Sequence, residues 1–311
     1  MRIVFMGTPP AAVPTLWRLI EEGHLIVAVW TQPDRPSGRG NKLSASPVKE
    51  LAISHGLTVH QPDRIKTPES IALFASHTAE LVVVVAYGRI LPTEFLRAPK
   101  RGCINVHFSL LPLYRGAAPV NWAIVNGETR TGVTTMFIEE ELDSGPILLQ
   151  QETPIGTRET APELMARLSE MGAQLLGETI GRLDVITPRP QRHRDATFAP
   201  LLRKENGLIN WTSSAHLVER CVRGLQPWPN AYTYHQRERL IVWRAEPTEG
   251  SPTQTAPGEV LAAHGDELIV KCGEQTALRL IDVQPEAKRR MRARDFLNGT
   301  HLKVGDRFEP A

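Results

Sequence analysis

The segment CINVHFSLLPLYRGAAP, residues 103–119, carries the residue types of this chain that are best suited to chemistry. If residues 102–108 form a strand, Asn105 and His107 are two positions apart and face the same side of an otherwise apolar strand. Farther along, ELDSGPIL places Asp143 in a turn between two plausible strands, residues 131–138 and 146–149.

These three side chains suit acyl transfer. An Asn carboxamide can donate to a developing oxyanion, a His can carry a proton, and a carboxylate can orient the His and stabilise its charged form. The nucleophile would come from the substrate, since no Ser or Cys is evidently poised. Spacing alone leaves a second interpretation open, in which Asn105 and His107 are satisfied structural residues and Asp143 only forms a turn.

The sequence predicts that the elements that position these residues form an α/β domain. Residues 3–6, 25–30, 81–86 and 104–108 are nearly continuous in apolar side chains, as expected for strands covered on both faces. Helical stretches lie between them. This alternation predicts a Rossmann-like, doubly wound and mostly parallel sheet, which binds ligands beyond the carboxyl ends of its strands.

A long helix over residues 160–183, with leucines at helical spacing, is expected to close a catalytic domain of residues 1–183. Residues 184–207 hold three prolines and several arginines and are expected to form an extended linker. From residue 208 to 311, one helix is followed by short strands separated by Gly and Pro, which predicts a small OB-like β-barrel.

Composition excludes several classes of protein. A net charge of +2 over 311 residues argues against binding to nucleic acid by bulk charge, although it permits a local basic patch. The three scattered cysteines indicate neither a disulfide framework nor a metal site, which favours a reduced cytoplasmic protein. The chain starts directly in a strand, and its longest apolar run is too short for a membrane span.

The segments INVHFSLLPLYRGAAP and LDSGPIL together resemble the signature of the 10-formyltetrahydrofolate-dependent formyltransferases. The match is long, ungapped and rich in unusual residues. It implies that Asn105, His107 and Asp143 are catalytic, that 10-formyltetrahydrofolate is the co-substrate, and that no metal takes part. It also implies a folate site lined by the SLLP loop, that is, by Ser109, Leu110, Leu111 and Pro112.

One departure from the family pattern concerns the residue after the histidine. The family commonly has a Gly there, and this chain has Phe108. The expectation is a bulky ring that reshapes the entrance to the folate pocket, with the catalytic residues themselves intact.

The family formylates several acceptors, and two further regions favour methionyl-tRNA. The basic segment of residues 31–49 resembles the insertion loop of family members that act on methionyl-tRNA, and the segments at 206–233 and 284–299 resemble their second domain. Phosphate contacts by cations there would position the initiator tRNA. The cations expected to bind it are Arg35, Arg39, Lys42, Lys49, Lys288, Arg289 and Arg290.

Three alternatives remain open. The nearest is a formyltransferase with another acceptor, or a hydrolase, with the same chemistry. A second is a non-catalytic RNA-binding α/β protein. The third, an NAD-dependent oxidoreductase, is opposed by GTPPAAVP after the first strand, which has one Gly where the dinucleotide fingerprint needs three. For the formyltransferase that acts on methionyl-tRNA, we expect a monomer.

Overall fold

The computed structural model describes residues 1–37, 42–248 and 255–309. The chain forms two compact units, which we call the N-terminal unit and the C-terminal unit. The N-terminal unit comprises Met1–Pro119, Arg130–Pro154 and Met165–Ala199, and the C-terminal unit comprises Val120–Thr129, Ile155–Leu164 and Pro200–Ala311.

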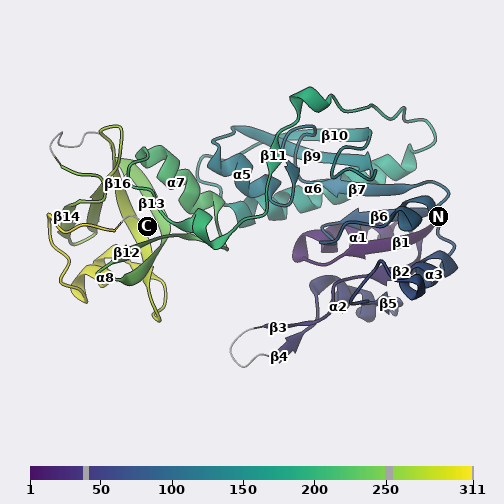
Figure 1. Cartoon of the computed structure of the whole chain (residues 1–311), viewed down its shortest axis with the longest axis horizontal. Helices are drawn as coiled ribbons and strands as arrows, with labels where there is room; N and C mark the ends of the chain where they lie inside the picture. Colours follow the sequence, from purple (N-terminus) through teal and green to yellow (C-terminus); the bar gives the residue numbers. More distant parts are fainter. Residues whose placement is uncertain (38–41, 249–254, 310–311) are drawn as a thin grey trace. The chain divides into compact units, whose positions relative to one another are not determined.

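Among the described residues, the N-terminal unit is built on a seven-stranded sheet in the order β10-β9-β7-β6-β1-β2-β5 (Figure 1). The five strands from β7 to β5 in this order are parallel, and β9 and β10 are antiparallel, which confirms the mostly parallel sheet. The strands are β1 (Arg2–Gly7), β2 (Leu25–Trp30), β5 (Val59–His60), β6 (Leu81–Val85), β7 (Cys103–His107), β9 (Arg130–Phe137) and β10 (Ile147–Pro154).

The parallel strands form because their sequences offer little but apolar side chains. In β6, LVVVV, every residue is buried, and β1 exposes only its first residue. A strand that is buried on both faces needs helices on both sides of the sheet. The helices of this unit are α1 (Val13–Glu21), α2 (Pro47–Ser54), α3 (Pro68–Ser76) and α4 (Thr93–Arg97), while α5 (Pro119–Val125) and α6 (Ala161–Gly181) contribute residues to both units.

Local signals set the starts of several helices. Ser46 caps α2 by accepting a hydrogen bond from the Lys49 amide, and Thr67 caps α3 in the same way. The expected long helix is α6, which begins after Thr160, whose amide and hydroxyl both donate to the Glu163 carboxylate.

Part of the segment expected as a linker belongs to the N-terminal unit, which extends to Ala199. There β11 (Phe198–Ala199) pairs in parallel with β8 (Arg115–Gly116). The Arg115 amide donates to the Thr197 carbonyl, and the Ala118 amide donates to the Ala199 carbonyl. This stretch is therefore paired with the main chain that follows β7.

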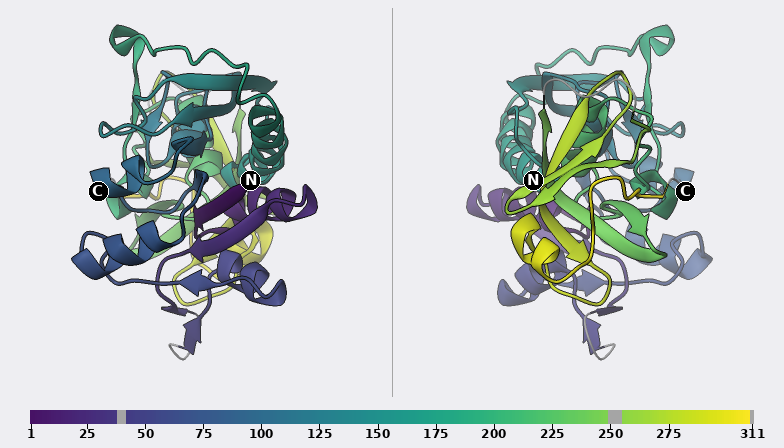
Figure 2. Two further views of the ribbon diagram at one scale, coloured as in Figure 1. Left: turned by 90° about the vertical axis from the view of Figure 1, so that its right-hand side faces the viewer. Right: turned by 90° about the vertical axis from the view of Figure 1, so that its left-hand side faces the viewer.

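In its described residues, the C-terminal unit contains a six-stranded antiparallel sheet in the order β12-β13-β16-β15-β14, with β17 paired to β16. Figure 2 (right) views these strands, drawn in green and yellow. Its elements are α7 (Ala215–Gly224), β12 (Ala231–His235), β13 (Glu238–Thr248), β14 (Val260–His264), β15 (Glu267–Lys271), β16 (Ala277–Pro285), β17 (Met291–Arg292) and α8 (Ala293–Asn298).

The two edges of this sheet are joined by the segment that follows α8. Glu309 pairs with Tyr234 of the edge strand β12, while Arg307 pairs with Glu259, directly before the other edge strand, β14. The amide of Phe308 also donates to the Gly258 carbonyl, and its side chain is fully buried in the core of the unit. One segment thus bridges both edges of the antiparallel sheet, which is consistent with the expected small β-barrel.

The described ranges also include a short hairpin in the segment after β2. Strands β3 (Arg35–Ser37) and β4 (Lys42–Ser44) form an antiparallel hairpin in the basic segment after β2. None of the helices in the described ranges is both long and apolar enough to cross a membrane.

Candidate active site

Strand β7 brings Asn105 and His107 to one face of the sheet, at its carboxyl end. It lies between β6 and β9, where His107 pairs with Thr134 and Asn105 with Met136. His107 is buried, while Asn105 is half-buried. Among the described residues, nothing hydrogen-bonds to the Asn105 carboxamide, which leaves its N–H groups available to a ligand.

The side chains of Val106 and Phe108, which alternate with them in sequence, pack on the side of α6. A Cβ atom at Gly172 of α6 would meet Val106 Cγ1 at 2.7 Å and Phe108 Cε1 at 3.4 Å, so both side chains pack against this helix. Phe108 is buried there, and its effect on the folate pocket stays a prediction. Alternation along the strand turns the ring away from His107, and the missing side chain of Gly172 makes room for it.

Asp143 lies in the turn that joins β9 to β10. Its φ of 50° is in the left-handed region, which few residues other than Gly adopt. Two residues later, Gly145 passes so close to β9 that a Cβ atom would overlap the Phe137 carbonyl. The Asp143 carboxylate accepts a hydrogen bond of 2.8 Å from the Gly116 amide, which fixes the direction of its side chain.

His107 has an oxygen acceptor at each ring nitrogen. Its Nε2 lies 2.9 Å from the Tyr114 carbonyl, which can only accept, so Nε2 carries a proton. Its Nδ1 lies 3.6 Å from Asp143 Oδ2, an ion-pair distance. Both side chains are largely buried, so water screens the attraction little. The geometry therefore places a carboxylate beside one nitrogen of an imidazole whose other nitrogen donates to a carbonyl.

A buried network lies behind the Asp143 turn. Gln191 Nε2 donates to the Asp143 carbonyl (2.9 Å) and the Gly145 carbonyl (2.8 Å), and Gln191 Oε1 accepts from the Arg115 guanidinium. Sequence reasoning missed Gln191, because it stands among prolines and arginines in the segment taken for a linker. No local pattern in the sequence signals its contact with the turn.

The SLLP loop follows β7 and is tied down by hydrogen bonds. Ser109 Oγ donates to the Leu113 carbonyl at 2.6 Å, and the Leu111 amide donates to Thr134 Oγ1 at 3.2 Å. The side chains of Ser109 and Leu111 are buried, whereas Leu110 and Pro112 are half-buried. The first two thus hold the loop in shape, and only the latter two have side-chain surface to offer a ligand.

A cavity of about 480 Å³ opens beside the Asp143 turn, within the usual range for small-molecule sites. Thr93, Leu96 and Arg97 of α4 line one side. The other lining residues are Ile138, Glu139, Glu140, Glu141, Ser144 and His193. The lining thus combines apolar side chains that could flank a flat ring, carboxylates that could accept from ring N–H groups, and one arginine.

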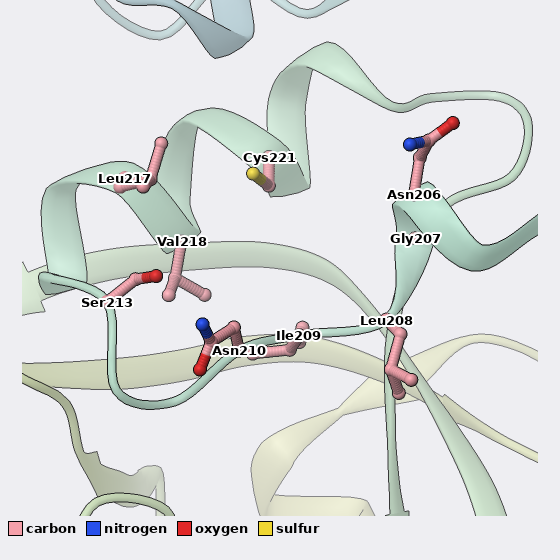
Figure 3. A pocket seen from close by; sticks show the side chains of 9 residues that line it. All are labelled: Asn206, Gly207, Leu208, Ile209, Asn210, Ser213, Leu217, Val218 and Cys221. Carbon is pink, nitrogen blue, oxygen red and sulfur yellow. The ribbon is translucent and has the colours of Figure 1, made fainter. Parts of the chain in front are cut away.

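A second cavity, in the C-terminal unit, is too small for such a ligand. It measures about 90 Å³, and Figure 3 shows Leu217, Val218 and Cys221 of α7 facing it together with Ile209. Burial raises the pKa of the Cys221 thiol to about 11, so the sulfur is not a reactive thiolate near neutral pH.

The cations expected to contact tRNA differ in their surroundings. Lys49 Nζ lies 2.6 Å from Asp34 Oδ2, and Gln61 donates to the other oxygen of that carboxylate at 2.8 Å. These bonds from Gln61 and Lys49 lower the pKa of Asp34. Arg35, in β3, is exposed, while Arg39 and the side chain of Lys42 lie outside the described residues.

In the C-terminal unit, Arg290 is 2.7 Å from Asp282 Oδ2 and lies over the Trp243 ring at 5.3 Å. Lys288 and Arg289 are exposed, and neither has an ion-pair partner among the described residues. Within the described ranges, no group of three or more His, Cys, Asp or Glu side chains could hold a metal ion.

Residues 1–180 match the model of the family described as "Formyl transferase", and residues 201–301 match "Formyl transferase, C-terminal domain". The chain is 48% identical over 308 residues to a protein of Caldanaerobacter subterraneus subsp. tengcongensis named methionyl-tRNA formyltransferase, over 98% of this chain and 99% of that protein. A protein of the same name from Citrifermentans bemidjiense is 48% identical over 307 residues, with coverage of 98% and 95%.

Two solved structures share the fold at lower identity. HypX from Aquifex aeolicus, in complex with tetrahydrofolic acid, has a TM-score of 0.64 at 19% identity, and the match covers 96% of this chain and 47% of HypX. An N-formyltransferase from Helicobacter canadensis has a TM-score of 0.63 at 17% identity, with coverage of 89% and 98%. Because the curated relatives are nearly half identical over almost their whole length, the likeness goes beyond a shared fold, and the chain belongs to the formyl transferase family.

Proposed function

We propose that the protein transfers the formyl group of 10-formyltetrahydrofolate to the α-amino group of initiator methionyl-tRNA. One observation carries the choice of acceptor. The proteins with 48% identity that span both units of this chain are named methionyl-tRNA formyltransferase. The product, N-formylmethionyl-tRNA, serves the initiation of translation.

In this mechanism the neutral α-amine attacks the formyl carbon, and a tetrahedral intermediate with an oxyanion forms. Asn105 donates its free N–H groups to that oxyanion, and the positive charge of His107 stabilises it. Asp143 holds His107 and relays a proton, through water, from the attacking amine to N10 of the folate. The carbon–N10 bond then breaks, which releases tetrahydrofolate and formylmethionyl-tRNA.

We place the folate ring in the cavity beside Asp143. Leu96 and Ile138 offer apolar contacts, and the carboxylates of the acidic run Glu139–Glu141 offer acceptors to the N–H groups of a pterin. Arg97 suits a carboxylate of the glutamate tail. Leu110 and Pro112 contribute the ligand-facing surface of the SLLP loop, while Ser109 and Leu111 keep that loop in place.

The tRNA is held by phosphate contacts from cations of the β3–β4 hairpin and of the segment before β17. Lys288 and Arg289 are the best placed of these, since they are exposed and have no ion-pair partner among the described residues. We further propose that the protein acts as a monomer in the cytoplasm, where aminoacyl-tRNA is made and used.

The decisive experiment supplies purified protein and 10-formyltetrahydrofolate with charged initiator tRNA, with charged elongator tRNA, or with neither. Formylmethionine on the initiator tRNA alone is the expected result. Formate released without any tRNA would instead identify a hydrolase. Tight tRNA binding without formyl transfer would identify a non-catalytic RNA-binding protein.

A further inference from the structure

We propose that Gln191 is a positioning residue for formyl transfer, which fixes the Asp143 turn against His107. The inference rests on the function proposed above and adds to it a residue from outside the formyl transferase signature. Gln191 lies between the segments matched by the two family models, residues 1–180 and 201–301.

The carboxamide of Gln191 is saturated with hydrogen bonds. Its Nε2 donates to the Asp143 carbonyl at 2.9 Å and the Gly145 carbonyl at 2.8 Å. Its Oε1 accepts from Arg115 Nε at 3.1 Å and from Nη2 at 2.8 Å. The residue is 7% exposed, so water cannot replace these partners.

Arg115 fixes the carboxamide from the other side. Its guanidinium is 2% exposed, with His193 Nδ1 at 3.4 Å and an exposed Glu141 carboxylate at 3.9 Å. A buried cation requires acceptors, and Gln191 supplies the closest one. Nε and Nη2 of Arg115 both donate to Gln191 Oε1. The Gln191 carboxamide therefore has its oxygen toward Arg115 and its N–H₂ group toward the turn.

These contacts close a ring around Asp143. The carboxylate of Asp143 accepts from the Gly116 amide, next to Arg115 in β8. Its carbonyl accepts from Gln191, whose oxygen is bonded to the Arg115 side chain. Asp143 is thereby held at both its main chain and its side chain.

The position of the turn depends on these contacts. Asp143 has a φ of 50°, in the left-handed region that Asp tolerates better than most residues. The ion pair to His107 is long, at 3.6 Å, and a further shift of the turn would weaken it. Catalysis by proton transfer and charge stabilisation is sensitive to displacements of about 1 Å.

The test is the nearly isosteric variant Gln191→Glu. It keeps the acceptor for Arg115 but places an oxygen against the carbonyls of Asp143 and Gly145, so two donated bonds are lost. The matched control is Gln226→Glu in the C-terminal unit. Gln226 is also buried, and its Nε2 donates to two main-chain carbonyls, those of Val222 (2.8 Å) and Trp243 (2.9 Å).

We expect Gln191→Glu to lower kcat about 10-fold or more, with each KM within about 2-fold of its wild-type value. Gln226→Glu should leave kcat within about 2-fold. In an Asp143→Asn background, Gln191→Glu should add less than about 2-fold in single-turnover assays, because its effect passes through Asp143. A general structural defect would instead multiply with the loss caused by Asp143→Asn.

Equal kcat in Gln191→Glu and Gln226→Glu, or multiplying losses in the double variant, would overturn the inference. If Gln191→Glu does not fold, Arg115→Lys breaks the same ring by replacing the paired donors, and the same readouts apply to it. Wild-type protein and Asp143→Asn belong in every assay. Failure of the wild type to formylate would count against the proposed function, whereas an active wild type with an unaffected Gln191→Glu would reject the positioning role alone.

Discussion

Charged side chains have opposite surroundings in the turn that carries Asp143 and in residues 288–290, before β17. At the turn, the carboxylate is largely buried, and two neighbours, Gly116 and Gln191, hydrogen-bond to Asp143. In residues 288–290, Lys288 and Arg289 are open to solvent, and Arg290 alone has a carboxylate partner in the described part of the chain. Chemistry at a formyl carbon depends on fixed geometry, whereas attraction to phosphate acts over several ångströms and tolerates exposure.

The largest effects are expected at the preorganised site. Asn105→Ala should lower kcat about 100- to 1,000-fold, as for the loss of an oxyanion donor. His107→Ala and Asp143→Ala should each cost about 100- to 10,000-fold, because proton transfer and charge stabilisation fail together. The loss of kcat is measured from initial rates of tRNA formylation, and circular dichroism checks that each variant is folded. A variant with near-normal kcat removes that residue from the mechanism.

Intermediate effects are expected from the exposed cations. Lys288→Ala and Arg289→Ala should each weaken tRNA-dependent kcat/KM and reduce the slope of its logarithm against log salt concentration by about 1. Arg39→Ala and Lys42→Ala, in the β3–β4 segment, should act in the same direction. The KM for 10-formyltetrahydrofolate should not change.

Arg290→Ala and Lys49→Met are the matched controls for this series, since each of these cations has a carboxylate within 2.7 Å, although Arg290 shares Asp282 with Arg244. Their effect on the salt slope should be smaller. If Arg290→Ala flattens the slope as much as Lys288→Ala does, then pairing with a carboxylate does not separate the cations that bind tRNA from those that do not.

The smallest effect concerns His60 and His77, which belong to neither region. Their rings lie 5.0 Å apart, and the Nε2 atoms of both are buried without a hydrogen-bond partner. Burial lowers the pKa of each below 6.5, and His60 lowers that of His77 further. As the pH falls below about 6.5, both histidines are protonated in the unfolded chain but stay neutral in the folded chain. The free energy of unfolding therefore decreases as the pH falls below this value.

His77→Phe should therefore reduce the fall in Tm between about pH 7 and pH 5.5, with formylation at pH 7 unchanged. Thermal unfolding followed by circular dichroism at both pH values measures this. Identical losses of Tm in the wild type and in His77→Phe would show that the pair does not govern the acid response.

Local sequence accounts for much of the fold. Uniformly apolar runs such as LVVVV reveal the buried parallel strands, and alternation along β7 gives the shared face of Asn105 and His107. The same alternation turns Phe108 to the other face. Its partner Gly172 could not be inferred, because nothing within one helix marks the residue that must be small to receive a distant ring.

The rest depends on contacts between remote segments. The distance from His107 to Asp143, the support by Gln191 and the pairing of Glu309 with Tyr234 arise only when the chain has folded. Ion pairs such as Lys49 with Asp34 are equally hidden, so a basic stretch of sequence overstates the charge left for a ligand. The roles of the catalytic trio, the folate loop and the tRNA cations remain predictions.

The pairing of β11 with β8 bears on where the first domain of this protein should be said to end. The match to the first family model ends at residue 180, yet the strand beside Arg115 and the carboxamide behind Asp143 come from the next twenty residues. A catalytic fragment that ended with the first family model, at residue 180, would lack β11 and Gln191, whereas one that ended after Ala199 would keep both. The boundary of the family model, residue 180, thus differs from the boundary of the structural unit that holds the site, Ala199.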